Sequence, residues 1–199
     1  MARSATVEES AEGVRERVLA TASALFYEHG VRAVGVDLVI ERAGVAKASL
    51  YRHFRTKDDL VAAYLEREDH DFWATWDAVR AEHPDDPADE LAAHMSWIGE
   101  RIGRPRYRGC PQINVAAEFA DNDHPARQVA VTHKRELRRR LTDIAARLGV
   151  SHPERLGGQL TVLVNGAFVS ASIIEPDEAV ALLTDMATAL VANAARPAP

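Results

Sequence analysis

Apolar residues recur at spacings of three and four along most of the chain, which is the pattern of amphipathic helices. The first such stretch runs from Val14 to Phe26 and ends at Gly30, a residue that often terminates helices in the left-handed conformation. The polar residues before it, 1 to 9, are expected to form an arm in which Arg3 could reach DNA. No stretch alternates with the period of two that indicates strands. The pattern therefore predicts an all-α protein of about nine helices.

Residues 35 to 57 predict two short helices joined by a turn at Gly44. The first would begin near Asp37, whose carboxylate can accept backbone hydrogen bonds at a helix start. The second has one buried stripe at helical spacing, so its other side chains face outward. Such a pair is a helix-turn-helix. The apolar positions of the two helices are Val36, Val39, Ile40, Ala43, Val45, Leu50 and Phe54.

The outward face of the second helix suits a polyanion. From Arg42 to Lys57 there are five Lys or Arg and no Asp or Glu, although the whole chain has a net charge of −6. Lys and Arg neutralise phosphates, and hydroxyl groups donate hydrogen bonds to them. Charge alone fits a solvated basic helix equally well, but the turn between two amphipathic helices favours double-stranded DNA. The residues predicted to contact DNA are Val36, Lys47, Ala48, Ser49, Tyr51, Arg52, His53 and Lys57.

The stretch AGVAKASLYRHFRTKDDL, residues 43 to 60, resembles the DNA-binding signature of the tetracycline-repressor (TetR) family. The segment from Leu50 to Phe54 and the later Lys57 are in register with that signature. Ala46 stands where the family often has a capping Ser, and Ala48 where it often has Gly. The detailed resemblance covers about residues 13 to 65. It implies a homodimeric transcription regulator, most often a repressor released from a palindromic operator when a small molecule binds the C-terminal domain.

A capping box from Thr56 to Asp59 opens a long helix that runs to about Ala81. At about 1.5 Å per residue it is long enough to leave the DNA-binding domain and enter a second one. We therefore expect a DNA-binding domain at residues 10–56 and a ligand-binding and dimerisation domain at residues 57–199. Further helices are expected at 88–102, 110–119, 125–148, 151–174 and 178–195, the fourth of them opened by a capping box from Ser151 to Glu154.

The last two helices are apolar and contain small residues, such as Gly166 and Ala167, that allow helices to approach closely. Two such hairpins from two chains would form a four-helix dimer interface. Alternatively, both helices complete the monomer core. Because a palindromic operator requires a two-fold dimer, we expect a homodimer through these helices.

Aromatic residues of the second domain could line an apolar cavity, with a few polar groups that orient a small-molecule effector. Taken singly, each fits an ordinary core position or a buried polar residue with its hydrogen bonds satisfied better than a ligand contact, and Glu118 fits a salt bridge to an Arg. The residues predicted to contact the effector are Trp73, Trp97, Cys110, Asn114, Glu118, His133, Asn165 and Phe168.

Cys110 supports a second hypothesis, a regulator that responds to oxidants or electrophiles. A thiol at a helix start lies near unsatisfied backbone donors, and Arg106 and Arg108 are close in sequence; both effects favour the reactive thiolate. Family members that sense reactive carbonyls or oxidants are similar from Gly109 to Glu118. A buried, inert cysteine is the alternative. A thiol enzyme that pairs Cys110 with a histidine and an architectural DNA binder without a ligand also stay open.

Composition indicates a cytoplasmic protein without a cofactor. The 199 residues, 47% of them hydrophobic, can bury a substantial core, and a single cysteine excludes an internal disulfide. The His and Cys spacings match no zinc motif, so no metal is expected. The N-terminus lacks the apolar core of a secretory signal, and the most apolar stretch, residues 160–174, is too short to span a bilayer.

Overall fold

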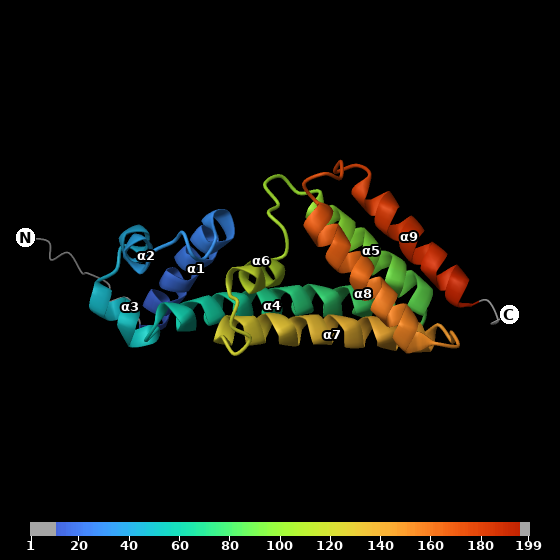
Figure 1. Ribbon diagram of the computed structural model, residues 1–199, viewed down its shortest axis with the longest axis horizontal. Helices are drawn as coiled ribbons and strands as arrows, with labels where there is room; N and C mark the ends of the chain where they lie inside the picture. The colour runs from blue at the N-terminus through green and yellow to red at the C-terminus, as the bar shows by residue number, and fades with distance from the viewer. Residues whose placement is uncertain (1–10, 196–199) are drawn as a thin grey trace, which may run out of the picture.

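The computed structural model describes residues 11–195, which form nine α-helices and no strand (Figure 1). The predicted all-α fold is confirmed. α1, α2 and α3 gather at one end of an elongated molecule, and α5, α8 and α9 at the other (Figure 1). The arm expected at residues 1–9, with Arg3, lies outside the described residues. The helices are α1 (Ala11–His29), α2 (Val36–Ala43), α3 (Lys47–His53), α4 (Lys57–Glu82), α5 (Pro87–Ile102), α6 (Pro111–Glu118), α7 (Pro125–Arg147), α8 (Pro153–Ser170) and α9 (Ala179–Ala194).

α2 and α3 form the predicted helix-turn-helix. Gly44 between them has φ 63° and ψ 39°, a left-handed conformation that glycine adopts without steric cost. Val39 of α2 and Leu50 of α3 are buried in a common core with α1. Ala46, the N-cap of α3, forms no side-chain capping hydrogen bond, because it has no side-chain oxygen.

The capping box that opens α4 is present as predicted. Thr56 Oγ1 accepts a hydrogen bond from the Asp59 N–H, and the Asp59 carboxylate accepts one from the Thr56 N–H. The first turns of this 26-residue helix pack in the N-terminal core through Leu65, and its later turns pack in the C-terminal core through Trp76. One continuous helix therefore belongs to both cores, and the N-terminal core extends past the expected boundary at residue 56.

The capping box predicted at Ser151 is wrong. α8 begins at Pro153, and its N-cap is His152, which forms no side-chain capping hydrogen bond. Proline favours the first helical position, where its missing N–H costs nothing, so the cap falls one residue after Ser151. α8 also ends at Ser170 and not near residue 174. The apolar stretch at residues 160–174 had suggested a longer helix. Ile173 is 83% exposed, however, so its side chain gains no burial that would favour extending the helix.

Glycines bring the C-terminal helices into close contact. A Cβ atom added to Gly99 of α5 would lie 2.6 Å from the Val180 Cα of α9. A Cβ atom added to Gly157 of α8 would lie 2.2 Å from the Thr142 Oγ1 of α7. The backbones can approach this closely only where a side chain is missing. In the described part of the chain, no helix is long and apolar enough to cross a membrane.

Candidate nucleic-acid interface and effector domain

The outer face of α3 carries most of the residues predicted to contact DNA. Leu50 is buried and anchors the helix, whereas Tyr51 is 41% exposed. Of the other predicted residues on α3, Lys47, Ala48 and Arg52 are exposed, and Ser49 and His53 are half-buried. The helix lies at the end of the molecule opposite α9 (Figure 1). The arrangement leaves α3 free to enter a DNA groove.

Three of the predicted DNA-binding residues have particular surroundings. Lys47 Nζ donates a hydrogen bond to Asp37 Oδ1 at 3.1 Å, which raises the pKa of Lys47. Because both side chains are exposed, solvent screens this pair, and a phosphate can replace the carboxylate. Lys57 Nζ instead donates a hydrogen bond to the Val31 carbonyl at 2.6 Å, so Lys57 stabilises the connection between α1 and α2. Val36, at the start of α2, is half-buried.

In the C-terminal domain the aromatic side chains pack against one another. The centroid of the Phe72 ring lies 4.9 Å from those of Trp73, Trp97 and His133. The cavity beside Phe72 has a volume of about 10 Å³, room for about one water molecule. Of the residues predicted to contact the effector, Cys110, His133 and Phe168 line this cavity. An effector that binds there must first separate these side chains.

Buried polar atoms without partners gather at this cavity. His133 Nδ1 lies 2.6 Å from Asp69 Oδ1, whereas its Nε2 is buried and has no hydrogen-bond partner among the described residues. Burial lowers the pKa of His133 to about 4, although the hydrogen bond to Asp69 acts in the other direction. The neutral ring that donates from Nδ1 leaves Nε2 as an acceptor. Gln112 Oε1 is also buried without a hydrogen-bond partner within residues 11–195, and no sequence pattern had singled out Gln112.

Glu118 and Asn114 lie away from that cavity. The Glu118 carboxylate, at the end of α6, accepts hydrogen bonds from the backbone N–H groups of Val31 at 3.0 Å and Arg32 at 2.7 Å. Asn114 Nδ2 donates to the Arg108 carbonyl at 2.8 Å. Both side chains line a hollow of about 220 Å³ between α1 and α6. In place of a salt bridge to an Arg, the Glu118 contact joins the C-terminal domain to the connection between α1 and α2.

Cys110, the N-cap of α6, is 6% exposed. Lys134 Nζ lies 3.4 Å from its sulfur and 5.2 Å from the centroid of the Phe168 ring. Since Lys134 lies 24 residues along the chain, sequence spacing gave no sign of it. Asn165, half-buried on α8, has a buried Oδ1 without a partner among the described residues.

Comparison with known proteins identifies the family. Residues 18–64 match the family model of bacterial regulatory proteins of the tetR family. The chain is 30% identical over 180 residues to the HTH-type transcriptional repressor Rv3405c of Mycobacterium tuberculosis. The aligned region covers 83% of this chain and 91% of the repressor. It resembles the crystal structure of SCO4454, a TetR-family transcriptional regulator from Streptomyces coelicolor, with a TM-score of 0.87, 30% identity and coverage of 92% and 96% of the two chains. The chain belongs to the TetR family.

As a member of the TetR family, the chain is a DNA-binding transcription regulator and not an enzyme. The hypothesis of a thiol enzyme is therefore wrong. The match to the HTH-type transcriptional activator FasR of Mycolicibacterium smegmatis is 43% identical over 53 residues and spans 24% of FasR. The names of these relatives therefore include both an activator and a repressor.

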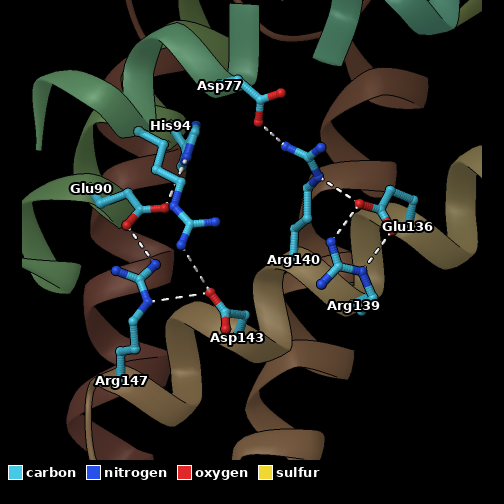
Figure 2. Close-up of polar contacts among 9 residues, drawn as sticks. Asp77, Glu90, His94, Glu136, Arg139, Arg140, Asp143 and Arg147 are labelled. Atoms are coloured by element: carbon cyan, nitrogen blue, oxygen red, sulfur yellow. Dashed lines mark hydrogen bonds and ion pairs between the residues drawn. The ribbon is translucent and has the colours of Figure 1, made fainter. Parts of the chain in front are cut away.

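Two networks of ion pairs join α7 of this TetR-family chain to neighbouring helices (Figure 2). In the first, Arg140 of α7 pairs with Asp77 of α4 and with Glu136, which also pairs with Arg139. In the second, Arg147 of α7 lies 2.5 Å from the Glu90 carboxylate of α5, and Asp143 pairs with Arg147 and with Arg80 of α4. Both networks tie α4 to the body of the C-terminal domain. In the second network Glu90 is only 1% exposed, so a buried carboxylate is neutralised by a partly exposed Arg.

His94 lies beside this network and is fully buried. Its ring stacks on Trp76 with 3.7 Å between the centroids, and Nε2 lies 3.6 Å from Glu90 Oε1. Burial lowers the pKa of His94 to about 3, and nearby cations act in the same direction. His94 is therefore neutral near pH 7. Nowhere within residues 11–195 do three or more His, Cys, Asp or Glu side chains group in a way that could hold a metal ion.

α8 and α9 expose large apolar side chains. Val162 of α8 is 73% exposed and Met186 of α9 is 53% exposed. Both line a hollow of about 740 Å³ formed with α7. Contiguous exposed apolar surface of this kind indicates an interaction site. The other large exposed apolar residues of this face and its connection are Val169, Ile173 and Leu182.

Proposed function

We propose that this TetR-family protein is a homodimeric repressor that leaves a palindromic operator in the cytoplasm when a small molecule binds its C-terminal domain. The observation that carries the proposal is the exposed polar face of α3, which Leu50 anchors at the end of the molecule opposite α9. Lys47, Tyr51 and Arg52 supply the cations and the hydroxyl that contact with DNA requires.

The exposed apolar side chains of α8 and α9 support a dimer through these two helices. Val162 and Met186 would leave water if the same face of a second chain covered them. A two-fold dimer of this kind presents two α3 helices to DNA. For both to enter successive major grooves, their centres must lie about 34 to 36 Å apart.

Two connections support the release of the operator by an effector. α4 packs in both cores, and the Glu118 contact joins α6 to the connection between α1 and α2. An effector that opens the aromatic cluster would shift α4 or α6 and so change the distance between the two α3 helices. The operator is released only if the effector binds the opened state more tightly than the closed one.

The test is operator binding by α3 variants in a gel-shift assay. We expect Lys47→Ala and Tyr51→Ala each to reduce operator affinity at least about tenfold while the protein stays folded and dimeric. Loss of the Lys47 phosphate contact should also reduce the slope of log affinity against log salt by about one. Arg104→Ala, which removes an exposed cation from the C-terminal domain, is the control and should bind like the parent. Retained binding by both α3 variants would contradict the assignment of α3.

A second hypothesis concerns how release is triggered. Lys134 Nζ lies 3.4 Å from the Cys110 sulfur, and this contact motivates a regulator that responds to electrophiles through Cys110. N-ethylmaleimide would add to Sγ at one alkene carbon while the other carbon takes up a proton. If this hypothesis holds, N-ethylmaleimide releases the operator from the parent protein and not from Cys110→Ser. Equal release from both proteins would contradict it.

A further inference from the structure

A second hollow in the C-terminal domain opens to solvent between α6, α7 and α8, with a volume of about 400 Å³. We call it the α6–α7 groove. Its volume falls in the range of about 300 to 1,000 Å³ that is typical of sites for small ligands, whereas the cavity beside Phe72 has room for about one water molecule. None of the eight residues predicted to contact the effector lines this groove. The groove is therefore a different hollow from the cavity beside Phe72, which it adjoins at Gln112.

One face of α7 gives the groove its charge. Arg127, Lys134, Arg135 and Arg138 line it, and none of the lining residues is Asp or Glu, although the chain has a net charge of −6. Lys134 follows Arg127 by seven residues, about two helical turns, and Arg138 follows Lys134 by four and Arg135 by three, so these side chains lie along one side of the helix. The apolar part of the lining includes Ile113, Ala116 and Val131. The groove thus combines an apolar floor with a cationic rim.

Two of the four cations already have partners. Arg127 Nη1 donates hydrogen bonds to the carbonyl groups of Ala116 at 3.0 Å and Phe119 at 2.7 Å. Lys134 lies against the Cys110 sulfur. Arg135 and Arg138 are exposed and form no ion pair with any residue from 11 to 195. Glu154 lines an adjoining hollow with Arg138, but the two side chains are not paired.

We propose that the α6–α7 groove binds an organic anion in which a carboxylate is attached to an aromatic or aliphatic body. A guanidinium forms two parallel hydrogen bonds to a carboxylate, so Arg135 and Arg138 match the charged end of such a ligand. The body of the ligand covers Ile113 and Val131 and removes their apolar surface from water. Lys134 adds positive charge at the inner end of the groove.

The groove is also connected to the DNA-binding domain. Arg127 holds the C-terminal carbonyl groups of α6, and the last residue of α6 is Glu118, which accepts the N–H groups of Val31 and Arg32. A carboxylate in the groove competes with those carbonyl groups for Arg127 and loosens this end of α6. This effect on the operator rests on the proposed function, whereas binding of the anion does not.

The test is isothermal titration calorimetry of the full chain with 1-naphthoate as the probe. We expect one molecule to bind per chain, and the neutral 1-naphthalenemethanol to bind at least about tenfold more weakly, because it lacks the charge that the guanidinium groups recognise. The double variant Arg135→Gln, Arg138→Gln should lose at least about tenfold in affinity. Arg139→Gln is the matched control, because Arg139 lies on the same helix but pairs with Glu136 outside the groove.

Thermal unfolding of each variant shows that it is folded before titration. Failure of 1-naphthoate to bind, equal affinity for the neutral alcohol, or equal affinity of the double variant and the parent would each overturn the proposal. The proposed function fails separately, if the protein binds no operator DNA. If 1-naphthoate binds as expected and leaves operator affinity unchanged, the site stands and its link to α6 is contradicted.

Discussion

Replacing Glu118 by alanine tests how the DNA-binding helices are held against the C-terminal domain. The Glu118 carboxylate accepts two backbone N–H groups, at 3.0 and 2.7 Å, that belong to a segment 86 or 87 residues earlier in the chain. A hydrogen bond to a charged group contributes about 1.5 to 3 kcal/mol when it is well protected. Because the contact is partly exposed and water replaces the carboxylate, we expect the pair to contribute about 2 kcal/mol to the free energy of unfolding.

A loss of this size has a measurable effect on a chain of 199 residues. For proteins of this length, about 1 kcal/mol corresponds to about 2 to 4 °C in the unfolding midpoint, so Glu118→Ala should lower Tm by about 4 to 8 °C. The freed DNA-binding domain would sample more orientations, and operator affinity measured by fluorescence anisotropy should fall about five- to tenfold. This loss would occur although every residue on the outer face of α3 is unchanged.

Glu66→Ala is the control for Glu118→Ala. Glu66 is an exposed carboxylate on α4 with no ion pair among the described residues, so its removal should change neither quantity. If Glu118→Ala matched the parent in Tm to within about 1 °C and in operator affinity, the Glu118 contact would not hold the two domains together.

Three further predictions concern the C-terminal domain. Met186→Glu places a charge on the exposed apolar face of α9 and should convert the dimer to a monomer in light scattering; an unchanged mass would exclude this face as the interface. Gly99→Ala forces a Cβ atom to 2.6 Å from the Val180 Cα and should reduce the free energy of unfolding by about 1 to 3 kcal/mol in urea, whereas Gly158→Ala, which meets nothing within 4 Å, should not. His94 has a folded pKa of about 3, below its value of about 6.5 in an unfolded chain, so the unfolded state binds more protons and stability should fall as pH decreases below 6.5, by up to about 1.4 kcal/mol per pH unit. A urea series from pH 7 to 5 in which His94→Phe shows the same slope as the parent would contradict that origin.

The sequence predicted the fold well where local rules decide it. Gly44 lies in the left-handed conformation expected for the turn, and the capping box at Thr56 opens α4 at the predicted residue. In both places the outcome depends on backbone geometry within a few residues. The box at Ser151 failed for a local reason as well, because Pro153 fixed the first helical position and moved the cap to His152.

The contacts of the candidate site depend on tertiary packing, which local patterns do not encode. The carboxylate of Glu118 and the ammonium of Lys57 both reach the connection between α1 and α2, which no spacing in sequence indicates. The predicted aromatic residues are in the C-terminal core, but their side chains pack against one another and leave a cavity of only about 10 Å³. The more open α6–α7 groove forms because α6 and α8 pack beside a basic face of α7, and this packing is not encoded in sequence spacing.

We propose that this chain binds a palindromic operator as a dimer through α3. The decisive experiment is the selection of binding sites from random duplex DNA by the purified protein. We expect enrichment of an inverted repeat whose half-site centres lie about 10 base pairs, one helical turn, or a small multiple of that apart, with two chains bound per site. Lys47→Ala, selected in parallel, should enrich nothing. Failure of the parent protein to enrich any sequence, or enrichment of a single asymmetric site by a monomer, would contradict the claim.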